Sequence, residues 1–366
     1  METMLDYIRE TPQRFLNNLD DPQFAEELVD FYCKHQFKGL TMIASGSSYN
    51  GALCALYYLK QYFPQVKLIT PFTFMQHDDE IGNSMPLAIS QSGCSTNTLE
   101  ALRHLKQHDH LAAALIGRTD GDMRALADLT VNWGVGEEKI GFVTKGVTTL
   151  AGFLMVFALK CAYRQQLIST EEYEKQYSQL RQTMAIHQQV CELTQQLYQQ
   201  HSEMINGCSK VYFLASGPAF GVAREGALKM SETSCIPAMA VEVEEFLHGP
   251  VYPADPDTLM IFIDNSEHPS SQRLVDIAEA CQSITERIIL FSNLTSDLPA
   301  VIKTDLQTSA CSSPLYKLAA VQLLAYLRTE ATNHYHPHDN VLKFKKENRV
   351  ASKSRGNLYL DLQNHR

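Results

Sequence analysis

A lysine, a glutamate and a histidine in the second half of the sequence have the types and spacing of a proton-transfer site. Lys229 and Glu232 are three residues apart, so they would share one face of a helix. His248 follows sixteen residues later, directly before Gly249 and Pro250. Carboxylates and imidazoles are the side chains that most often move protons to and from a substrate. A solvated ion pair and a histidine in a structural turn would give the same pattern, and both interpretations stay open at this point.

The hydroxyl-rich loop at residues 90–95 (Ser-Gln-Ser-Gly-Cys-Ser) has the composition of a phosphate site. It follows an apolar run typical of a buried strand and opens a segment typical of a helix. Free N–H groups and the positive end of a helix dipole favour an anion at such a position. An ordinary N-terminal cap is the alternative, since serine and threonine are common caps. Ser47 and Ser48 follow the preceding strand and would face the same crevice, which favours the phosphate interpretation.

Thr144 lies in a turn-rich segment, residues 138–149, that leads into an apolar helix. Its hydroxyl could donate to a phosphate or could cap the helix. The cap is the simpler interpretation of the residues alone.

Two histidine patterns raise the question of a metal. Glu245 and His248 have Glu-x-x-His spacing, but a dinuclear carboxylate site needs a second such motif and two further glutamates. His334, His336 and His338 alternate, yet no cysteine or acidic second set accompanies them. We therefore predict no metal and no cofactor.

The segments that must position these residues alternate between strands and helices. Short turns between them indicate parallel pairing and right-handed crossovers. Strands are predicted at residues 39–44, 66–70, 85–90, 111–116, 128–133, 210–214, 258–263 and 287–292, and helices at 52–62, 99–107, 145–163, 169–201, 221–234, 270–281 and 315–327.

The chain contains an internal repeat. Residues 44–47 (Ala-Ser-Gly-Ser) and 215–218 (Ala-Ser-Gly-Pro) both end an apolar strand and start a helix. The repeat predicts an α/β fold of two tandem α/β/α sandwiches with mainly parallel sheets. We expect N-terminal helices at 1–34, a first domain at 35–165, a helical connection at 166–205, a second domain at 206–332 and a basic C-terminal tail at 333–366.

The composition disfavours several classes of partner. The net charge is −10 and no basic stripe runs over the main body, so we expect no nucleic acid. No apolar run approaches about 18 residues, and the N-terminus lacks the basic and apolar regions of a secretory signal. The nine cysteines contain no Cys-x-x-Cys pair, which favours a reducing compartment. We therefore expect a cytoplasmic protein that binds no membrane.

Taken together, these motifs resemble the sugar isomerase (SIS) domain family over roughly residues 35 to 335. In that family a Ser-Gln-Ser-Gly-Glu-Thr loop holds the sugar phosphate, and residues 90–95 match it. The family's Cys-Gly-Thr-Ser turn, its Glu-Gly-Ala-Leu-Lys-x-x-Glu helix and its Lys-His-Gly-Pro segment are matched by residues 45–48, 225–232 and 247–250. No single motif is decisive, but four in order on a duplicated chain are specific. A well-known relative is the isomerase half of glutamine:fructose-6-phosphate amidotransferase.

The resemblance implies a role for each candidate residue. Glu232 would be the base that moves a proton between C1 and C2 of an open-chain sugar. His248 would assist ring opening and would reach the site of a neighbouring subunit, which implies a homodimer with shared active sites. Lys229 would orient a hydroxyl or tune Glu232. The sugar phosphate would be held by Ser47, Ser48, Ser90, Gln91, Ser92, Ser95 and Thr144.

The sequence departs from the amidotransferase in three respects. No glutaminase domain precedes the first SIS strand, so we do not expect this chain to make ammonia from glutamine. Cys94 stands where the family loop has a glutamate. The amidotransferase's C-terminal lysine arm has no clear register here, and Lys343, Lys345 and Lys346 are the candidates.

A stand-alone pair of SIS domains of this length resembles the fructosamine 6-phosphate deglycases. The expected reaction releases a hexose 6-phosphate and an amine from a 6-phosphorylated fructosamine, and it needs no cofactor. One alternative is a glucosamine-6-phosphate isomerase or deaminase. The other is a non-catalytic phosphosugar sensor, which is disfavoured because residues 1–34 are too short and too acidic for a DNA-binding domain.

Overall fold

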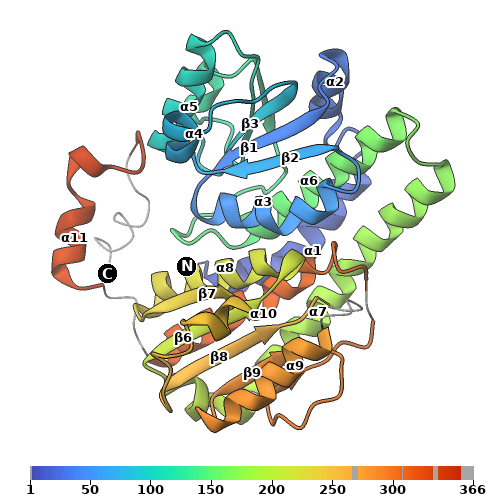
Figure 1. Cartoon of the computed structure of the whole chain (residues 1–366). Helices are drawn as coiled ribbons and strands as arrows, with labels where there is room; N and C mark the ends of the chain where they lie inside the picture. The colour runs from blue at the N-terminus through green and yellow to red at the C-terminus, as the bar shows by residue number, and fades with distance from the viewer. Residues whose placement is uncertain (1, 266–270, 307, 333–336, 356–366) are drawn as a thin grey trace. The chain divides into compact units, whose positions relative to one another are not determined.

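The structure is a computed structural model that describes residues 2–265, 271–306, 308–332 and 337–355 (Figure 1). The chain divides into two compact units. The first takes in Glu10–Arg181 together with the tail from His338, and the second takes in Met4–Arg9 and Gln182–Pro337. Each unit contains one five-stranded parallel sheet, which confirms the predicted pair of α/β domains.

The sheet of the first unit has the strand order β2-β1-β3-β4-β5. The chain leaves β1 for β2 on one side and then returns to β3 on the other, so a topological switch point lies between β1 and β3. In register, Ala44 pairs with Ile89, and the segments that follow these two strands therefore emerge side by side. Ligands bind beyond such strand ends in open α/β sheets. The strands are β1 Gly39–Ala44, β2 Gln65–Ile69, β3 Ser84–Ser90, β4 Ala113–Ile116 and β5 Leu129–Asn132.

Helices cover both faces of this sheet. α4 and α5 lie on one face, and α3 and α6 pack against each other on the opposite face (Figure 1). Ile43, Phe74 and Leu102 belong to the buried cluster under α4 and α5. The helices are α1 Met4–Asp20, α2 Glu26–Lys34, α3 Gly46–Leu59, α4 Pro71–His77, α5 Thr96–Gln107, η1 Asp122–Ala125 and α6 Lys145–Arg164, and the tail adds α11 Asp339–Lys345 and η5 Asn348–Val350.

The apolar helix α6 is the central helix of the first unit. By length and composition alone it could cross a membrane, but 94% of that stretch is buried inside the fold. A helix that is apolar on every side is expected in a protein core as well as in a bilayer. α6 is therefore a core helix packed between α2 and α3.

The long polar helix that sequence analysis placed at 169–201 is α7, Thr170–Asn206, with non-helical backbone at His201. Ser169 caps it by accepting a hydrogen bond from the N–H of Glu172 at 3.1 Å. The first unit ends and the second begins within this helix. The expected boundaries at 165 and 206 remain predictions.

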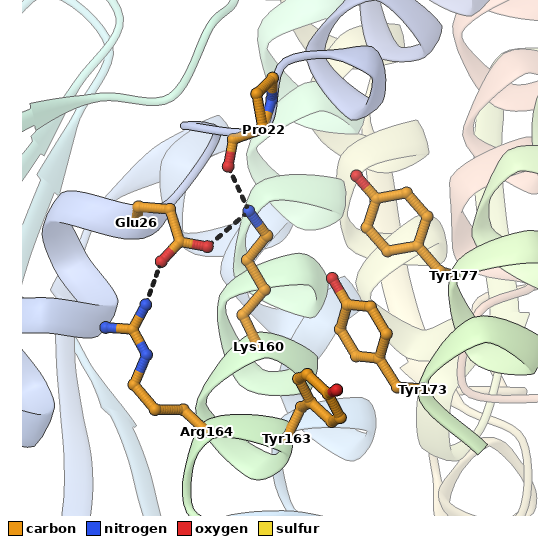
Figure 2. Close-up of a pocket in the computed structure, with 7 residues that line it drawn as sticks. All are labelled: Pro22, Glu26, Lys160, Tyr163, Arg164, Tyr173 and Tyr177. Atoms are coloured by element: carbon orange, nitrogen blue, oxygen red, sulfur yellow. Dashed lines mark hydrogen bonds and ion pairs between the residues drawn. The ribbon is translucent and has the colours of Figure 1, made fainter. Parts of the chain in front are cut away.

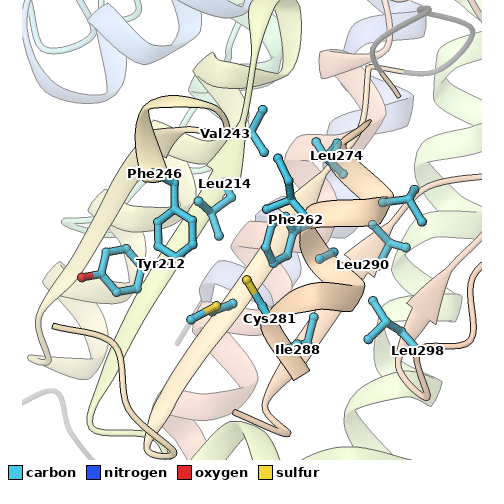
Figure 3. Close-up of a cluster of buried hydrophobic side chains, with 14 residues drawn as sticks. Tyr212, Leu214, Val243, Phe246, Phe262, Leu274, Cys281, Ile288, Leu290 and Leu298 are labelled. Atoms are coloured by element: carbon cyan, nitrogen blue, oxygen red, sulfur yellow. The ribbon is translucent and has the colours of Figure 1, made fainter. Parts of the chain in front are cut away.

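The sheet of the second unit repeats the first, with the order β10-β9-β8-β6-β7 and a switch point between β6 and β8. Figure 3 shows the core on one of its faces, where Leu214, Phe262 and Leu290 meet Leu274 of α9. α8 and α10 pack against each other. The elements are β6 Lys210–Ala215, η2 Gly217–Ala219, α8 Phe220–Ser234, β7 Ala238–Glu242, η3 Glu245–His248, β8 Thr258–Ile263, α9 Ser271–Ala280, η4 Cys281–Ser283, β9 Ile288–Phe291, β10 Val301–Ile302 and α10 Pro314–Thr332.

Candidate functional site

The hydroxyl-rich loop lies where sequence analysis placed it, between the end of β3 and the start of α5. Its serine side chains converge: Ser90 Oγ is 2.8 Å from Ser95 Oγ and 3.5 Å from Ser92 Oγ. Gly93 has a φ of +64°, and an added Cβ there would lie 2.7 Å from Gly121 Cα. Only glycine fits this position, because both the left-handed backbone and the close approach exclude a side chain.

Lys353 from the C-terminal tail completes this cluster. Its ammonium donates to Ser92 Oγ at 3.0 Å and to Ser95 Oγ at 3.1 Å. Burial lowers the pKa of Lys353. Among the described residues no carboxylate forms an ion pair with it, so its positive charge is offset only by hydroxyl dipoles. Three hydroxyls and one cation at a helix N-terminus are the donor set of an anion site.

Backbone hydrogen bonds hold the tail on the loop. Ser95 and Lys353 form an antiparallel bridge. The N–H of Thr96 donates to Ser352 O at 3.1 Å, and the N–H of Ser354 donates to Cys94 O at 2.9 Å. The sequence candidates Lys343, Lys345 and Lys346 are exposed on or next to α11 instead. The lysine at the loop is therefore Lys353, which motif comparison did not find.

An acidic residue anchors the end of the tail. Asp122 accepts a hydrogen bond from Ser354 Oγ at 2.6 Å and forms an ion pair with Arg355. These partners lower the pKa of the Asp122 carboxyl, the Ser354 hydroxyl having the largest effect. Arg355 also donates to Asp120 O at 3.0 Å. The tail is thus fixed on both sides of Lys353.

Gln91 turns from the loop toward a carboxylate that sequence analysis missed. Its Nε2 donates to Glu138 Oε2 at 2.6 Å, and its buried Oε1 has no hydrogen-bond partner among the residues that the structure describes. Glu138 also accepts from the N–H groups of Thr144 at 2.8 Å, Lys145 at 2.9 Å and Gly146 at 3.3 Å. Burial raises the pKa of Glu138, and the bond from Gln91 is the largest opposing effect. A carboxylate of the protein itself therefore occupies the N-terminus of α6.

Thr144 is buried, and its N–H donates to Glu138, which in turn accepts a hydrogen bond from Gln91 of the loop. Its hydroxyl donates to Phe142 O at 2.9 Å, within its own turn. The cap of α6 is the Glu138 side chain and not the Thr144 hydroxyl, because the N-cap Thr144 makes no side-chain cap bond. A phosphate contact by Thr144 remains a prediction.

Ser47 and Ser48 lie in the first turn of α3, which follows β1, the strand next to the one that precedes the loop. Gly46 begins this turn with a φ of +57°. Ser47 is buried and Ser48 is half-buried. Asn97 Nδ2, in the first turn of α5, donates to Ser45 Oγ at 2.9 Å and ties the two helix starts together. The expectation that both strand ends contribute to one crevice stays a prediction.

In the second unit, Lys229 lies between two carboxylates on α8. Its ammonium is 3.1 Å from Glu225 Oε1 and 2.7 Å from Glu232 Oε2. The side chains of Lys229 and Glu225 are fully buried, whereas that of Glu232 is 37% exposed. Burial acts to lower the pKa of Lys229, but the two carboxylates outweigh it and raise the pKa above its ordinary value. Lys229 and Glu232 therefore form an ordered ion pair in which only the carboxylate of Glu232 is accessible to solvent. They are not a solvated pair on the protein surface.

His248 ends the 3-10 helix η3, and its side chain is exposed. Within the described residues no hydrogen bond or ion pair joins it to Glu232 or Lys229. Glu245 is also exposed, and its N–H donates to Glu242 Oε2 at 3.0 Å. The structure thus brings Lys229 together with Glu232 and leaves His248 facing solvent.

Over the described part of the chain, no three His, Cys, Asp or Glu side chains gather so as to hold a metal ion. His338 caps α11 by accepting a hydrogen bond from the N–H of Asn340. His334 and His336 lie outside the described residues. Cys94 is buried in the hydroxyl-rich loop.

Comparison with known proteins found a matching domain model and distant relatives. The model of the SIS domain matches residues 204–326. Glutamine–fructose-6-phosphate aminotransferase (isomerizing) of Francisella tularensis is 25% identical over 339 residues, covering 88% of this chain and 55% of that protein. The Xylella fastidiosa protein of the same name is 27% identical over 329 residues, covering 84% of this chain and 52% of its own length. The chain therefore spans about half the length of the curated relatives it matches.

Solved structures show the same fold. The C-terminal domain of glucosamine-fructose-6-phosphate aminotransferase from Francisella tularensis superimposes with a TM-score of 0.80 at 23% identity, covering 90% of this chain and 96% of that one. Glucosamine-6-phosphate deaminase from Thermotoga maritima gives a TM-score of 0.72 at 18% identity, covering 92% of this chain and 97% of that one. At these identities the likeness concerns the fold alone.

Proposed function

Because the chain carries a SIS domain and is homologous to the isomerase domain of glutamine–fructose-6-phosphate aminotransferase, we propose that it performs phosphosugar isomerase-type chemistry. We further propose that its substrate is a 6-phosphorylated fructosamine, which it breaks down to a hexose 6-phosphate and an amine. The observation that supports this most directly is the cluster in the first unit formed by the Ser90, Ser92 and Ser95 hydroxyls and the half-buried ammonium of Lys353.

The proposed phosphate site supplies complementary charge and donors. Lys353 carries a positive charge that no carboxylate neutralises within the described residues, so a phosphate dianion would be its counter-ion. The hydroxyls of Ser90, Ser92 and Ser95 would donate to the phosphate oxygens, with Ser47 and Ser48 from the neighbouring helix start. Charge-assisted hydrogen bonds of this kind are about twice as strong as neutral ones. This binding would anchor the sugar by the end that does not react.

The proposed proton transfer uses Glu232. The ammonium of Lys229 fixes its carboxylate in one orientation, and Glu225 balances the charge of that lysine in the protein interior. Glu232 would remove a proton from C1 of the open-chain substrate to give an enaminol, and would return a proton to C2 to give an aldose imine. Water would then add to the imine carbon and release the amine. The partial exposure of Glu232 suits a base that must reach a substrate.

His248 would assist ring opening, and we propose that it does so in the site of a second copy of the chain within a homodimer. Its exposure on η3 is consistent with that role.

The test is a coupled assay of 6-phosphorylated fructose-amino acids, with glucosamine 6-phosphate alongside. Release of glucose 6-phosphate from a fructose-amino acid, with deuterium from heavy water at C2, would support the proposal. Fructose 6-phosphate and ammonia from glucosamine 6-phosphate would instead identify a deaminase. If the protein bound phosphosugars but turned over none of these substrates, the enzymatic proposal would be overturned.

A matched pair of variants then tests the base. Glu232→Gln should lower kcat by about 100- to 10,000-fold, the usual contribution of a general base, while phosphosugar binding persists. Glu286→Gln changes an exposed carboxylate of the same unit and should leave kcat unchanged. Full activity of Glu232→Gln would remove this residue from the mechanism.

A further inference from the structure

Acidic side chains on one face of α2 form ion pairs with basic side chains on one face of α6. Glu26 Oε1 lies 2.8 Å from Lys160 Nζ, and Arg164 forms ion pairs with both Glu26 and Asp30. Figure 2 shows Glu26 between Lys160 and Arg164 at the wall of a pocket whose other side carries Tyr173 and Tyr177. Glu26 and Asp30 are one helical turn apart, so they mark the side of α2 that faces α6.

Two cysteines lie on these matched faces. Cys33 is three residues beyond Asp30, on the same side of α2, and Cys161 lies between Lys160 and Arg164 in the sequence of α6. The neighbouring Tyr32 packs edge-on against Phe157 of α6, with ring centroids 5.8 Å apart. Arg164, one turn beyond Cys161, forms an ion pair with Asp30, one turn before Cys33, so the two thiols lie on facing turns of the two helices. Cys161 is buried, whereas Cys33 is half-buried and open to small reagents.

The surroundings give the two thiols different acidities. The hydrogen bond from Cys161 has the largest effect on Cys33 and, with Arg164 and the Gln165 side chain, outweighs burial and Asp30 to lower its pKa to about 6. Burial raises the pKa of the Cys161 thiol. Tyr32 is the other titratable group here, and β5, which also packs on α2, has no titratable side chain. At neutral pH the pair is therefore a thiolate beside a thiol.

We propose that Cys33 and Cys161 form a peroxide-oxidised dithiol site, in which Cys33 is the attacking thiolate, Cys161 is the resolving thiol, and the product is a disulfide that joins α2 to α6. The Cys33 sulfur takes one oxygen of hydrogen peroxide as the O–O bond breaks, giving a sulfenic acid and hydroxide. The Cys161 sulfur then attacks the Cys33 sulfur, and the sulfenic oxygen leaves as water with the Cys161 proton. The two thiols lose two electrons, and the peroxide is reduced to water.

This site shares no residue with the hydroxyl-rich loop or with the α8 carboxylates, so its test does not depend on the proposed reaction. The chain also offers a matched control, the exposed Cys235. Burial raises the pKa of the Cys235 thiol, and no cysteine is paired with it among the described residues.

The first experiment uses the unmodified protein. Iodoacetamide labelling at pH 7, followed by peptide mass spectrometry, should alkylate Cys33 at least about tenfold faster than Cys235, because the thiolate is the reacting species. The labelling rate of Cys33 should fall off around pH 6. Equal labelling rates at pH 7 would overturn the proposal.

The second experiment adds hydrogen peroxide at neutral pH and maps peptides without reduction. A linked peptide of Cys33 and Cys161, lighter by two hydrogens, is the expected product. In Cys161→Ser, dimedone should instead trap a sulfenic acid at Cys33, and in Cys235→Ser the linked peptide should form as in the parent. Oxidation of Cys33 to sulfinic acid with no linked peptide in the parent protein would overturn the role of Cys161.

Discussion

Lys353 Nζ lies 3.0 Å from Ser92 Oγ, although 261 positions separate the two residues in the chain. The contact places a tail residue at the end of a strand in the first sheet, beyond which the helix α5 begins. A half-buried ammonium held by hydroxyls is under-compensated, since hydroxyl dipoles replace only part of its hydration. An anion is the group that would complete this arrangement.

Removal of the Lys353 charge should weaken substrate binding more than turnover. We expect Lys353→Met to raise KM for a phosphosugar by about 10- to 100-fold, as for loss of a charge-assisted hydrogen bond worth about 1.5–3 kcal/mol. Competition by inorganic phosphate should weaken in parallel. Lys346→Met, at an exposed position in the same tail, is the control. An unchanged phosphate inhibition constant in Lys353→Met would contradict the anion site.

Loss of the Glu138 carboxylate should destabilise the start of α6. Glu138→Gln keeps the shape but removes the charge that three backbone N–H groups share, so we expect about 1–2 kcal/mol less stability in urea unfolding. The neighbouring Glu137 is exposed and pairs with Lys139 at 3.1 Å, so Glu137→Gln should cost no more than about 0.5 kcal/mol. Equal effects of the two variants would show that the cap contributes nothing.

A methyl group on Gly146 should displace Gln91. An added Cβ would lie 1.8 Å from Gln91 Oε1, so Gly146→Ala forces that side chain away from Glu138. We expect the variant to lose stability and phosphosugar affinity together. In a Gln91→Ala background the same change should cost much less, because the clash is gone. Additive effects in this double-mutant cycle would mean that the two residues do not interact.

The Lys229 cluster should add stability that disappears in strong alkali. The pKa of Lys229 is raised on folding, so the native state binds the proton more tightly than the unfolded chain does. Its contribution is complete below the ordinary lysine pKa of about 10.4 and falls as the pH rises further. Lys229→Met should flatten this alkaline loss and should cost about 3–5 kcal/mol at pH 7, since the buried carboxylate of Glu225 loses the ion pair with Lys229. The measurement is the free energy of unfolding in urea between pH 7 and pH 11. If Lys229 were not responsible, this free energy would fall equally with pH in the parent protein and in Lys229→Met.

Shared active sites can be tested by mixing two inactive proteins. If His248 acts in the partner's site, a hybrid of Glu232→Gln and His248→Ala subunits contains one intact site and one doubly altered site. An equal mixture should then recover about a quarter of the parent activity after subunit exchange. Each homodimer alone should remain inactive. No recovery in a mixture shown to contain hybrids would place His248 and Glu232 in the same subunit's chemistry.

Local pattern was enough to predict the framework of the site. An apolar strand followed by glycine and serine identifies a strand end, and residues 90–95 and 45–48 lie at two adjacent ends because the repeat implies parallel pairing. The spacing of Lys229 and Glu232 likewise predicts their contact, since three residues on a helix make one turn. These inferences need only neighbours in sequence and the rules of secondary structure.

The groups that were missed come from distant segments. Glu138 reaches Gln91 across 47 positions and Lys353 reaches Ser92 across 261, and neither distance leaves a periodic signal. The strand β7 was missed as well, because it is a short, half-exposed edge strand whose single partner is β6. Cys33 and Cys161 are also far apart in the sequence, so no sequence motif links them. They come together only because α2 packs on α6.

The position of Lys353 in the chain also orders events during synthesis. The cation of the first unit's loop is translated only after every strand and helix of the second unit. A nascent chain with both sheets already emerged from the ribosome would therefore still lack the charge that completes its anion site. If the proposed phosphate site is correct, a chain stalled before Lys353 would bind phosphate more weakly than the complete chain, even with its first sheet folded.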